Sequence, residues 1–244
     1  MNRPALIIAK KELRMFFDSL VAYILLIAFL GFSGFFTWFY GSDIFLTKQA
    51  SLQSFFQIAY WTLFFFIPAL TMRSLAEENK TGTIELLLTK PVTNWQVLWG
   101  KFLACLLLIF IALLCTLPYF ITVIYLGSGK VDIGVVLCGY IGLLLMSAAY
   151  ISIGIFASSV TSNQVVAFLV ALFIGIFFHF IFGLLGNTLT GSTGELINYL
   201  SMSAHFDGVS RGLIDSRDLV YFASIIFLGL VMAEVSLAKR NISE

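Results

Sequence analysis

The chain has 244 residues, of which 60% are hydrophobic and only 11% are charged. A soluble domain carries about 25% charged residues, so this composition excludes a water-soluble enzyme, a basic nucleic-acid-binding domain and a disordered protein. The sequence therefore indicates an integral membrane protein whose main surroundings are the lipid bilayer.

The N-terminal segment, residues 1–18, predicts an amphipathic helix. On a helical wheel Lys11 and Arg14 lie on the charged face, and Leu13 lies on the apolar face. Such a helix lies in the membrane interface with its basic side chains toward anionic head groups. Glu12 projects near the apolar face. Two interpretations remain open for it: a carboxylate that reaches the interface, or an ion pair with a basic residue of the loop in residues 73–101.

Six apolar segments are long enough to cross a bilayer as helices, which takes about 20 residues each. They are apolar on all sides and about twice as long as a β-barrel strand, so helices are favoured. We predict an all-α integral membrane protein, organised as one transmembrane domain over residues 1–244. The predicted spans are residues 20–41, 55–71, 97–126, 133–160, 165–185 and 219–238.

Six spans place both termini on the same side of the membrane. Four basic residues lie in one set of connecting segments, and ten lie in the other set, which the positive-inside rule assigns to the cytoplasm. We therefore expect both termini and the 73–97 loop in the cytoplasm, and the 186–218 loop outside. The ten are Arg3, Lys10, Lys11, Arg14, Arg73, Lys80, Lys90, Lys101, Lys239 and Arg240.

Residues 73–101 are the most informative stretch, because many of the few charges gather there. We expect the second span to continue as a helix to about Asn79. Gly82 should end that helix, since glycine tolerates the left-handed conformation found past helix C-termini. Thr93 with Gln96 predicts a capping box at the start of the third span.

Between these two breaks, residues 83–90 predict a short helix. Thr83 can cap it, Glu85 lies in its first turn, where the helix dipole favours a carboxylate, and Pro91 follows its end. Two interpretations remain open: a plain connector in the membrane interface, or a helix that docks on a cytoplasmic partner. Its apolar side chains, which would not be left bare in water, are Ile84, Leu86, Leu87 and Leu88.

His179 lies in the middle of the fifth span. An ionisable residue inside the membrane is a functional candidate by default. A neutral histidine can also hydrogen-bond to a neighbouring helix, so a packing role and a place along a transport pathway both remain open.

The outer loop, residues 186–218, predicts one or two short re-entrant or interfacial helices. They should end in a turn closed by Arg–Asp salt bridges, in which Arg211 and Asp215 take part. This segment is either a structural lid or an exit gate that an outer partner contacts. His205 fits either role.

The chain carries no motif for catalysis. It lacks the G-x-x-x-x-G-K-[ST] loop that cradles nucleotide phosphates and the H-E-x-x-H zinc motif. Its three cysteines lie in apolar runs without metal-binding spacing. We expect no catalytic residues, no metal site and no cofactor bound by the chain, and no nucleic acid as partner. Energy for any transport must come from another protein.

The loop between the second and third spans also resembles that of a known family. The spacing of residues 77–101 resembles the signature loop of ABC-2 type transporter permeases. Residues 68–73 and 205–222 resemble a narrower group, the gliding-motility-associated ABC permeases, and the likeness covers essentially the whole chain. The motif runs Glu77-Glu78-(x3)-Gly82-Thr83-x-Glu85-Leu86-Leu87-(x3)-Pro91-Val92-(x7)-Gly100-Lys101.

The resemblance implies that residues 1–18 form an elbow helix and that the 73–97 loop is a coupling helix. This helix would dock on a cytoplasmic ATPase dimer that binds ATP and Mg²⁺. Two permease subunits, identical or related, would form an exporter-type pathway in the bacterial inner membrane. The residues expected to couple to the ATPase are Glu77, Glu78, Gly82, Thr83, Glu85, Leu86, Leu87, Pro91 and Lys101, with Lys11, Glu12 and Arg14 on the elbow.

A rival interpretation is a membrane protein that works without ATP, either a secondary carrier or an anchor within a larger complex. A carrier should show inverted repeats and helices broken at mid-membrane, and neither is evident. The residues that could line a pathway or gate are His179, His205, Arg211 and Asp215.

Overall fold

The computed structural model describes residues 3–39, 51–82, 92–127, 131–189 and 191–243, and no strand is found in these ranges. The predicted all-α class is confirmed. The elements are α1 (Arg3–Asp18), α2 (Leu20–Trp38), α4 (Gln53–Thr71), α5 (Ala76–Thr81), α7 (Asn94–Leu114), α8 (Leu117–Leu126), α9 (Ile133–Val160), α10 (Gln164–Ile176), the π-helix η1 (Phe177–Ile181), α11 (Phe182–Thr188), α12 (Ser192–Asn198), α13 (Met202–Ser210) and α14 (Ser216–Ser243).

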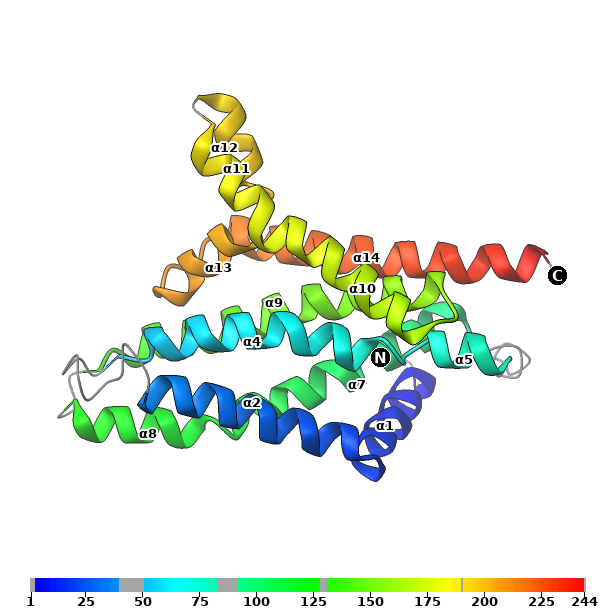
Figure 1. The fold of residues 1–244 in the computed structure, drawn as a ribbon, viewed down its shortest axis with the longest axis horizontal. Coiled ribbons are helices and arrows are strands. Elements are labelled where there is room, and N and C mark those ends of the chain that lie inside the picture. The colour runs from blue at the N-terminus through cyan, green and yellow to red at the C-terminus, as the bar shows by residue number, and fades with distance from the viewer. Residues whose placement is uncertain (1–2, 40–50, 83–91, 128–130, 190, 244) are drawn as a thin grey trace.

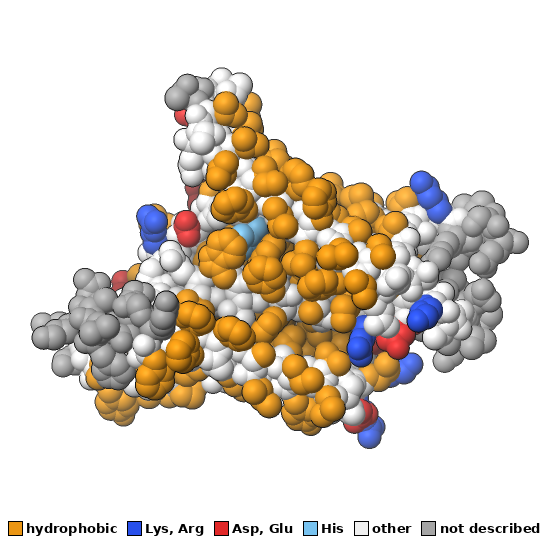
Figure 2. Space-filling model, in the orientation of Figure 1, with side chains coloured by type: hydrophobic (Ala, Val, Ile, Leu, Met, Phe, Trp, Pro, Cys, Tyr) orange, Lys and Arg blue, Asp and Glu red, His pale blue; other side chains and the backbone are white. Residues whose placement is uncertain are grey.

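The six predicted spans are present among the described residues as helical runs long and apolar enough to cross a membrane. The long helices lie side by side, and α1 lies across one end of the bundle, toward which both termini point (Figure 1). On the face shown in Figure 2, hydrophobic side chains cover the middle of the bundle and charged side chains lie toward its two ends. This distribution is the one expected of a bilayer-spanning bundle.

Two spans differ from the prediction. The second span does not run unbroken to Asn79: α4 ends at Thr71, a turn follows, and α5 begins at Ala76. The third span is divided into α7 and α8, with Pro118 in the first turn of α8. Proline lacks the backbone N–H that a helix interior needs and suits a helix start, so the chain bends just before it.

Helix α9 is the centre of the packing, because α14, α4, α10, α13 and α7 all contact it. Small residues along α9 let its neighbours approach closely. A Cβ atom on Gly139 would collide with the ring of Phe56, and one on Gly154 would collide with the side chain of Thr71. Both contacts are made by α4, which fixes α4 against α9.

The segment between the fifth and sixth spans contains two short helices, α12 and α13, as predicted. Helices α11 and α12 form a hairpin that projects from the bundle (Figure 1), and they pack closely at Gly186, where a Cβ atom would lie 2.7 Å from that of Asn198. Helix α13 lies against α9.

Candidate functional site

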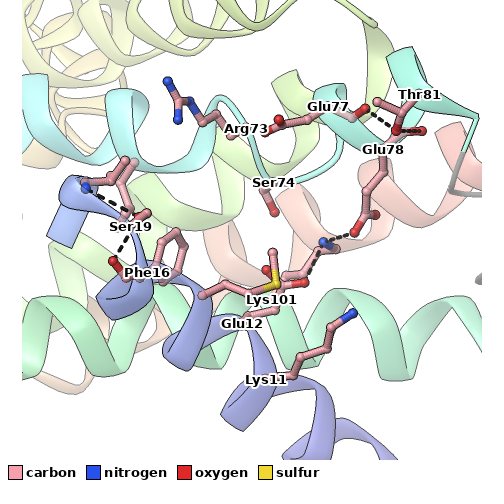
Figure 3. Close-up of a pocket in the computed structure, with 13 residues that line it drawn as sticks. Lys11, Glu12, Phe16, Ser19, Arg73, Ser74, Glu77, Glu78, Thr81 and Lys101 are labelled. Atoms are coloured by element: carbon pink, nitrogen blue, oxygen red, sulfur yellow. Dashed lines mark hydrogen bonds and ion pairs between the residues drawn. The ribbon is translucent and has the colours of Figure 1, made fainter.

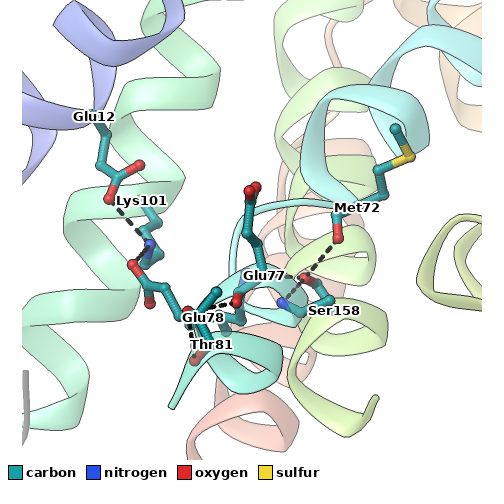
Figure 4. Close-up of polar contacts among 9 residues, drawn as sticks. Glu12, Met72, Glu77, Glu78, Thr81, Lys101 and Ser158 are labelled. Atoms are coloured by element: carbon teal, nitrogen blue, oxygen red, sulfur yellow. Dashed lines mark hydrogen bonds and ion pairs between the residues drawn. The ribbon is translucent and has the colours of Figure 1, made fainter. Parts of the chain in front are cut away.

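A buried lysine joins three helices at the end of the bundle where α1 lies. Lys101 of α7 is only 2% exposed, and its Nζ atom lies 2.7 Å from Oε1 of Glu78 and 3.0 Å from Oε1 of Glu12. Glu78 belongs to α5 and Glu12 to α1, and both carboxylates point at the ammonium group (Figures 3 and 4). We call these residues the Lys101 triad. The ion pair that was one interpretation of Glu12 is therefore present.

The position of α1 is set by a close contact with α7. A Cβ atom on Gly100 would lie 2.6 Å from Cγ2 of Ile8 and 3.1 Å from the carbonyl oxygen of Ala5. Ala5 and Ala9 are buried. Positions 5, 8, 9 and 12 share one helix face, so the same face that packs on α7 delivers Glu12 to Lys101. Glu12 thus faces protein, and its place near an apolar stripe is explained.

The position of α5 is set by a serine of α9. The backbone N–H groups of Leu75 and Ala76 both donate to Oγ of Ser158 at 2.9 Å, and Ser158 Oγ donates to the carbonyl oxygen of Met72 at 3.2 Å (Figure 4). One hydroxyl therefore satisfies three backbone groups at the turn between α4 and α5. No sequence pattern marks Ser158, which lies in an apolar span like many small residues.

A second contact fastens α5 further along. The Asn79 side-chain amide donates to the carbonyl oxygens of Thr161 at 3.2 Å and Ser159 at 3.4 Å, at the end of α9. Helix α5 is thus held by α9 on one side and by Lys101 of α7 on the other.

Both predicted boundaries of the loop are confirmed. Gly82 follows α5 with φ +68°, in the left-handed region. The Thr93 hydroxyl accepts from Gln96 N–H, and the Gln96 side chain accepts from Thr93 N–H, which completes the capping box of α7. The predicted helix 83–90 lies outside the described residues. The same holds for five of the predicted coupling residues, which are Thr83, Glu85, Leu86, Leu87 and Pro91.

A pocket of about 550 Å³ opens beside the Lys101 triad, lined by α1, the end of α4, α5 and α7. Glu77, Arg73 and Lys11 line it, with the Lys11 side chain directed away from Arg73 (Figure 3). Arg14 instead pairs with Asp18 at 3.8 Å, and both side chains are largely exposed. Such surface pairs contribute little, so of the three predicted elbow residues only Glu12 enters the triad.

The chain matches a known protein family over almost its whole length. A family model described as an ABC-2 family transporter protein matches residues 6–233, from the first turns of α1 to within α14. The chain belongs to the ABC-2 transporter family. Members of this family are transmembrane components of transporters and are generally not catalytic themselves. No curated protein matches the sequence.

The segment between the fifth and sixth spans of this ABC-2 protein does not form the predicted turn closed by Arg–Asp salt bridges. Within the described part of the chain, neither Arg211 nor Arg217 makes an ion pair; the Arg217 guanidinium donates to the Tyr199 hydroxyl at 3.1 Å. Instead, His205 Nδ1 and Asp218 Oδ1 form a hydrogen bond of 2.6 Å, which is an ion pair when the imidazole is protonated. The prediction was wrong because histidine, whose Nε2 also meets a backbone carbonyl, takes the nearby carboxylate.

Asp215 has a local role instead. Its Oδ1 atom accepts hydrogen bonds from the backbone N–H of Arg217 at 3.1 Å and from the Ser216 hydroxyl, so it caps the first turn of α14. The hydrogen bond from the Arg217 backbone is the main reason that the pKa of the Asp215 carboxyl lies below its ordinary value. Asp215 is therefore a helix cap of the ABC-2 protein in addition to any role at a gate.

His179 lies in the π-helix η1, apart from His205. It is 3% exposed, and its Nδ1 atom lies 2.6 Å from the Tyr150 hydroxyl. Its ring stacks on that of Tyr60 with the centroids 4.0 Å apart. Packing against neighbouring helices is thus shown for this histidine of the ABC-2 protein. Among the residues that the structure describes, no three His, Cys, Asp or Glu side chains gather as a metal site would require.

Proposed function

We propose that the chain is the permease subunit of an ABC transporter, powered by a separate cytoplasmic ATPase dimer that binds ATP and Mg²⁺. Membership of the ABC-2 family supports a transport role. The observation that carries the ATPase coupling is the Lys101 triad, because it locks α5, the helix that leads into the 83–91 segment, to α1 and α7.

The coupling follows from the way these helices are connected. A partner that pushes on the segment between Gly82 and α7 acts on both of its flanking helices. Since α5 is tied to Lys101 and to Ser158, the push reaches α1, α7 and α9 together. A buried charged network of this kind resists separation, because each ion left alone loses its compensation. We therefore expect the partner's push to tilt the helices of the bundle together.

The finer features of the proposal rest on charge and resemblance. Ten of 14 basic residues lie on the side of the termini and the 73–97 loop, which supports a cytoplasmic location for that end in a bacterial inner membrane. A second permease subunit, identical or related, would complete an exporter-type pathway. The likeness of residues 68–73 and 205–222 to gliding-motility-associated permeases supports a role in such a complex.

Purification from native membranes with mild detergent tests the proposal. A stoichiometric ATPase that stays with the chain, and whose nucleotide turnover depends on it, is the expected result. Isolation of the chain in an intact, folded form without any ATPase would favour the rival function, an anchor or a secondary carrier.

A further inference from the structure

A second pocket of about 500 Å³ lies between α4, the π-helix η1 with α11, and α13. None of the residues that line it belongs to the Lys101 triad or to its pocket. Polar side chains, Gln57 and Asp207 among them, and aromatic ones, Tyr60 and Trp61 among them, both contribute to its lining. His179 lines it as well, so a buried ionisable side chain meets a cavity.

His179 offers this pocket an unused hydrogen-bond donor. The Tyr150 hydroxyl is fully buried, and a phenol in that setting donates its proton where an acceptor is available. Donation to Nδ1 of His179 places the histidine proton on Nε2, a buried atom with no hydrogen-bond partner in the described structure. The opposite tautomer would leave two groups unsatisfied, the phenol proton and the Nε2 lone pair.

The surrounding geometry holds this donor in place. The Tyr60 ring stacks on His179 and also on Phe206, whose centroid is 4.6 Å away, and the Trp61 ring meets His179 edge-on at 4.4 Å. The π-helix Phe177–Ile181 carries His179. Such helices are rare, usually appear as single-turn bulges, and are frequent at functional sites. The π-helical bulge and the fixed imidazole ring together leave the Nε2–H group of His179 without an acceptor. This arrangement indicates that a ligand accepts its hydrogen bond.

Asp207 supplies the opposite chemistry. Its carboxylate lines the same pocket. Among the described residues no cation lies at ion-pair distance from it, and the more distant positive charge of Arg211 acts on it. Burial is the main cause that raises the pKa of Asp207. The rim is apolar and open, since Trp61 is 48% exposed and Phe180 is 53% exposed. A carboxylate with no cation in direct contact, a donor with no partner and an open apolar rim complement a molecule with a cation, an acceptor oxygen and an apolar tail.

We propose that this pocket binds the head of an amine-bearing amphiphile. Its ammonium group faces Asp207 among the aromatic rings, where cation–π attraction adds to the ion pair, and an oxygen of its phosphate or ester accepts from Nε2 of His179. The binding claim is independent of the ATPase partner, so it stands or fails separately from the transport proposal.

Trp61 provides the test. A variant that keeps Trp61 and replaces Trp38, Trp95 and Trp99 by Phe is placed in phosphatidylglycerol nanodiscs. Part of the lipid carries dibrominated acyl chains, on either phosphatidylethanolamine or phosphatidylglycerol, and quenching of Trp61 is measured. We expect the apparent affinity for the amine lipid to be about tenfold higher, which corresponds to ~1.4 kcal/mol. A parallel titration with soluble glycerophosphoethanolamine tests a water-soluble source of the same head group.

Asp207→Asn should reduce the ratio of the apparent affinities for the amine lipid and for phosphatidylglycerol to about one. His179→Phe, which keeps a stacking ring, should lower the apparent affinity for the amine lipid. Asp132→Asn is the matched control, because Asp132 caps α9 and an asparagine retains that acceptor. Selective quenching by the lipid, or a Trp61 response to the soluble compound alone, supports the site and identifies its source. The proposal is overturned if both lipids quench Trp61 equally and the soluble compound has no effect on it. It is also overturned if Asp207→Asn leaves the selectivity unchanged.

Discussion

At the scale of single residues, the proposed coupling depends on the buried ammonium group of Lys101. An ammonium group with 2% exposure is stable there because two carboxylates compensate its charge. The resemblance to permease loops singled out both Glu78 and Lys101, but nothing in the sequence shows that they touch. Glu12 could be suspected, since a carboxylate near an apolar face needs a partner. Ser158 could not, because a serine hydroxyl in an apolar span carries no signal of what it bonds.

Replacement of the lysine should therefore destabilise the protein strongly. In Lys101→Met the carboxylates of Glu12 and Glu78, which are 13% and 20% exposed, lose their cation. We expect a loss of about 3–5 kcal/mol, the usual cost of breaking a buried ion pair, measured by unfolding in mixed micelles. Lys11→Met is the control on the pocket rim and should change stability little. Equal stability of the Lys101 and Lys11 variants would contradict the proposed role of the triad.

Ser158→Ala should loosen the turn between α4 and α5. The change leaves two backbone N–H groups without their acceptor, and each buried unsatisfied group costs about 1–3 kcal/mol. Hydrogen exchange of residues 72–79 should become faster. Ser159→Ala is a matched control, because the Ser159 hydroxyl donates only to a carbonyl of its own helix. Unchanged exchange in Ser158→Ala would show that other contacts hold the turn.

At the scale of helices, the sequence predicted what local rules determine. Gly82 ends α5 and Thr93 with Gln96 begins α7, because caps depend on residues within one turn. The break between Thr71 and Ala76 was missed, since a hydroxyl from α9 stabilises it and no residue inside the turn announces it. The face of α1 that meets α7 was also missed, because it depends on Gly100, about 90 residues away.

That contact gives a prediction about α1. Gly100→Ala places a Cβ atom 2.6 Å from Ile8, and overpacking of this kind costs about 1–3 kcal/mol. Helix α1 should move off α7, so trypsin should cleave faster at Lys10, Lys11 and Arg14. Gly31→Ala is the control, because a Cβ atom there meets nothing within 4 Å. Cleavage at the same rate in both variants would mean that α1 is not held at Gly100.

At the scale of the whole molecule, composition predicted the membrane bundle, and six helical spans confirm it. A span is recognised by its length and apolarity, which are summed over many residues and tolerate local errors. How α1, α5 and α7 share charges could not be predicted in this way, because it depends on which few polar atoms meet at one end. In our proposal those atoms pass the push of the ATPase from the 83–91 segment to the helices of the bundle.

Coupled ATP turnover of the chain, reconstituted with its ATPase in lipid, tests the central claim most directly. Gly82→Pro forces φ from +68° toward about −65°, and Glu85→Lys reverses a charge in the segment that we expect the partner to contact. Both variants should insert in the membrane and lose the turnover that depends on the permease. Normal coupled turnover in both variants would contradict the account.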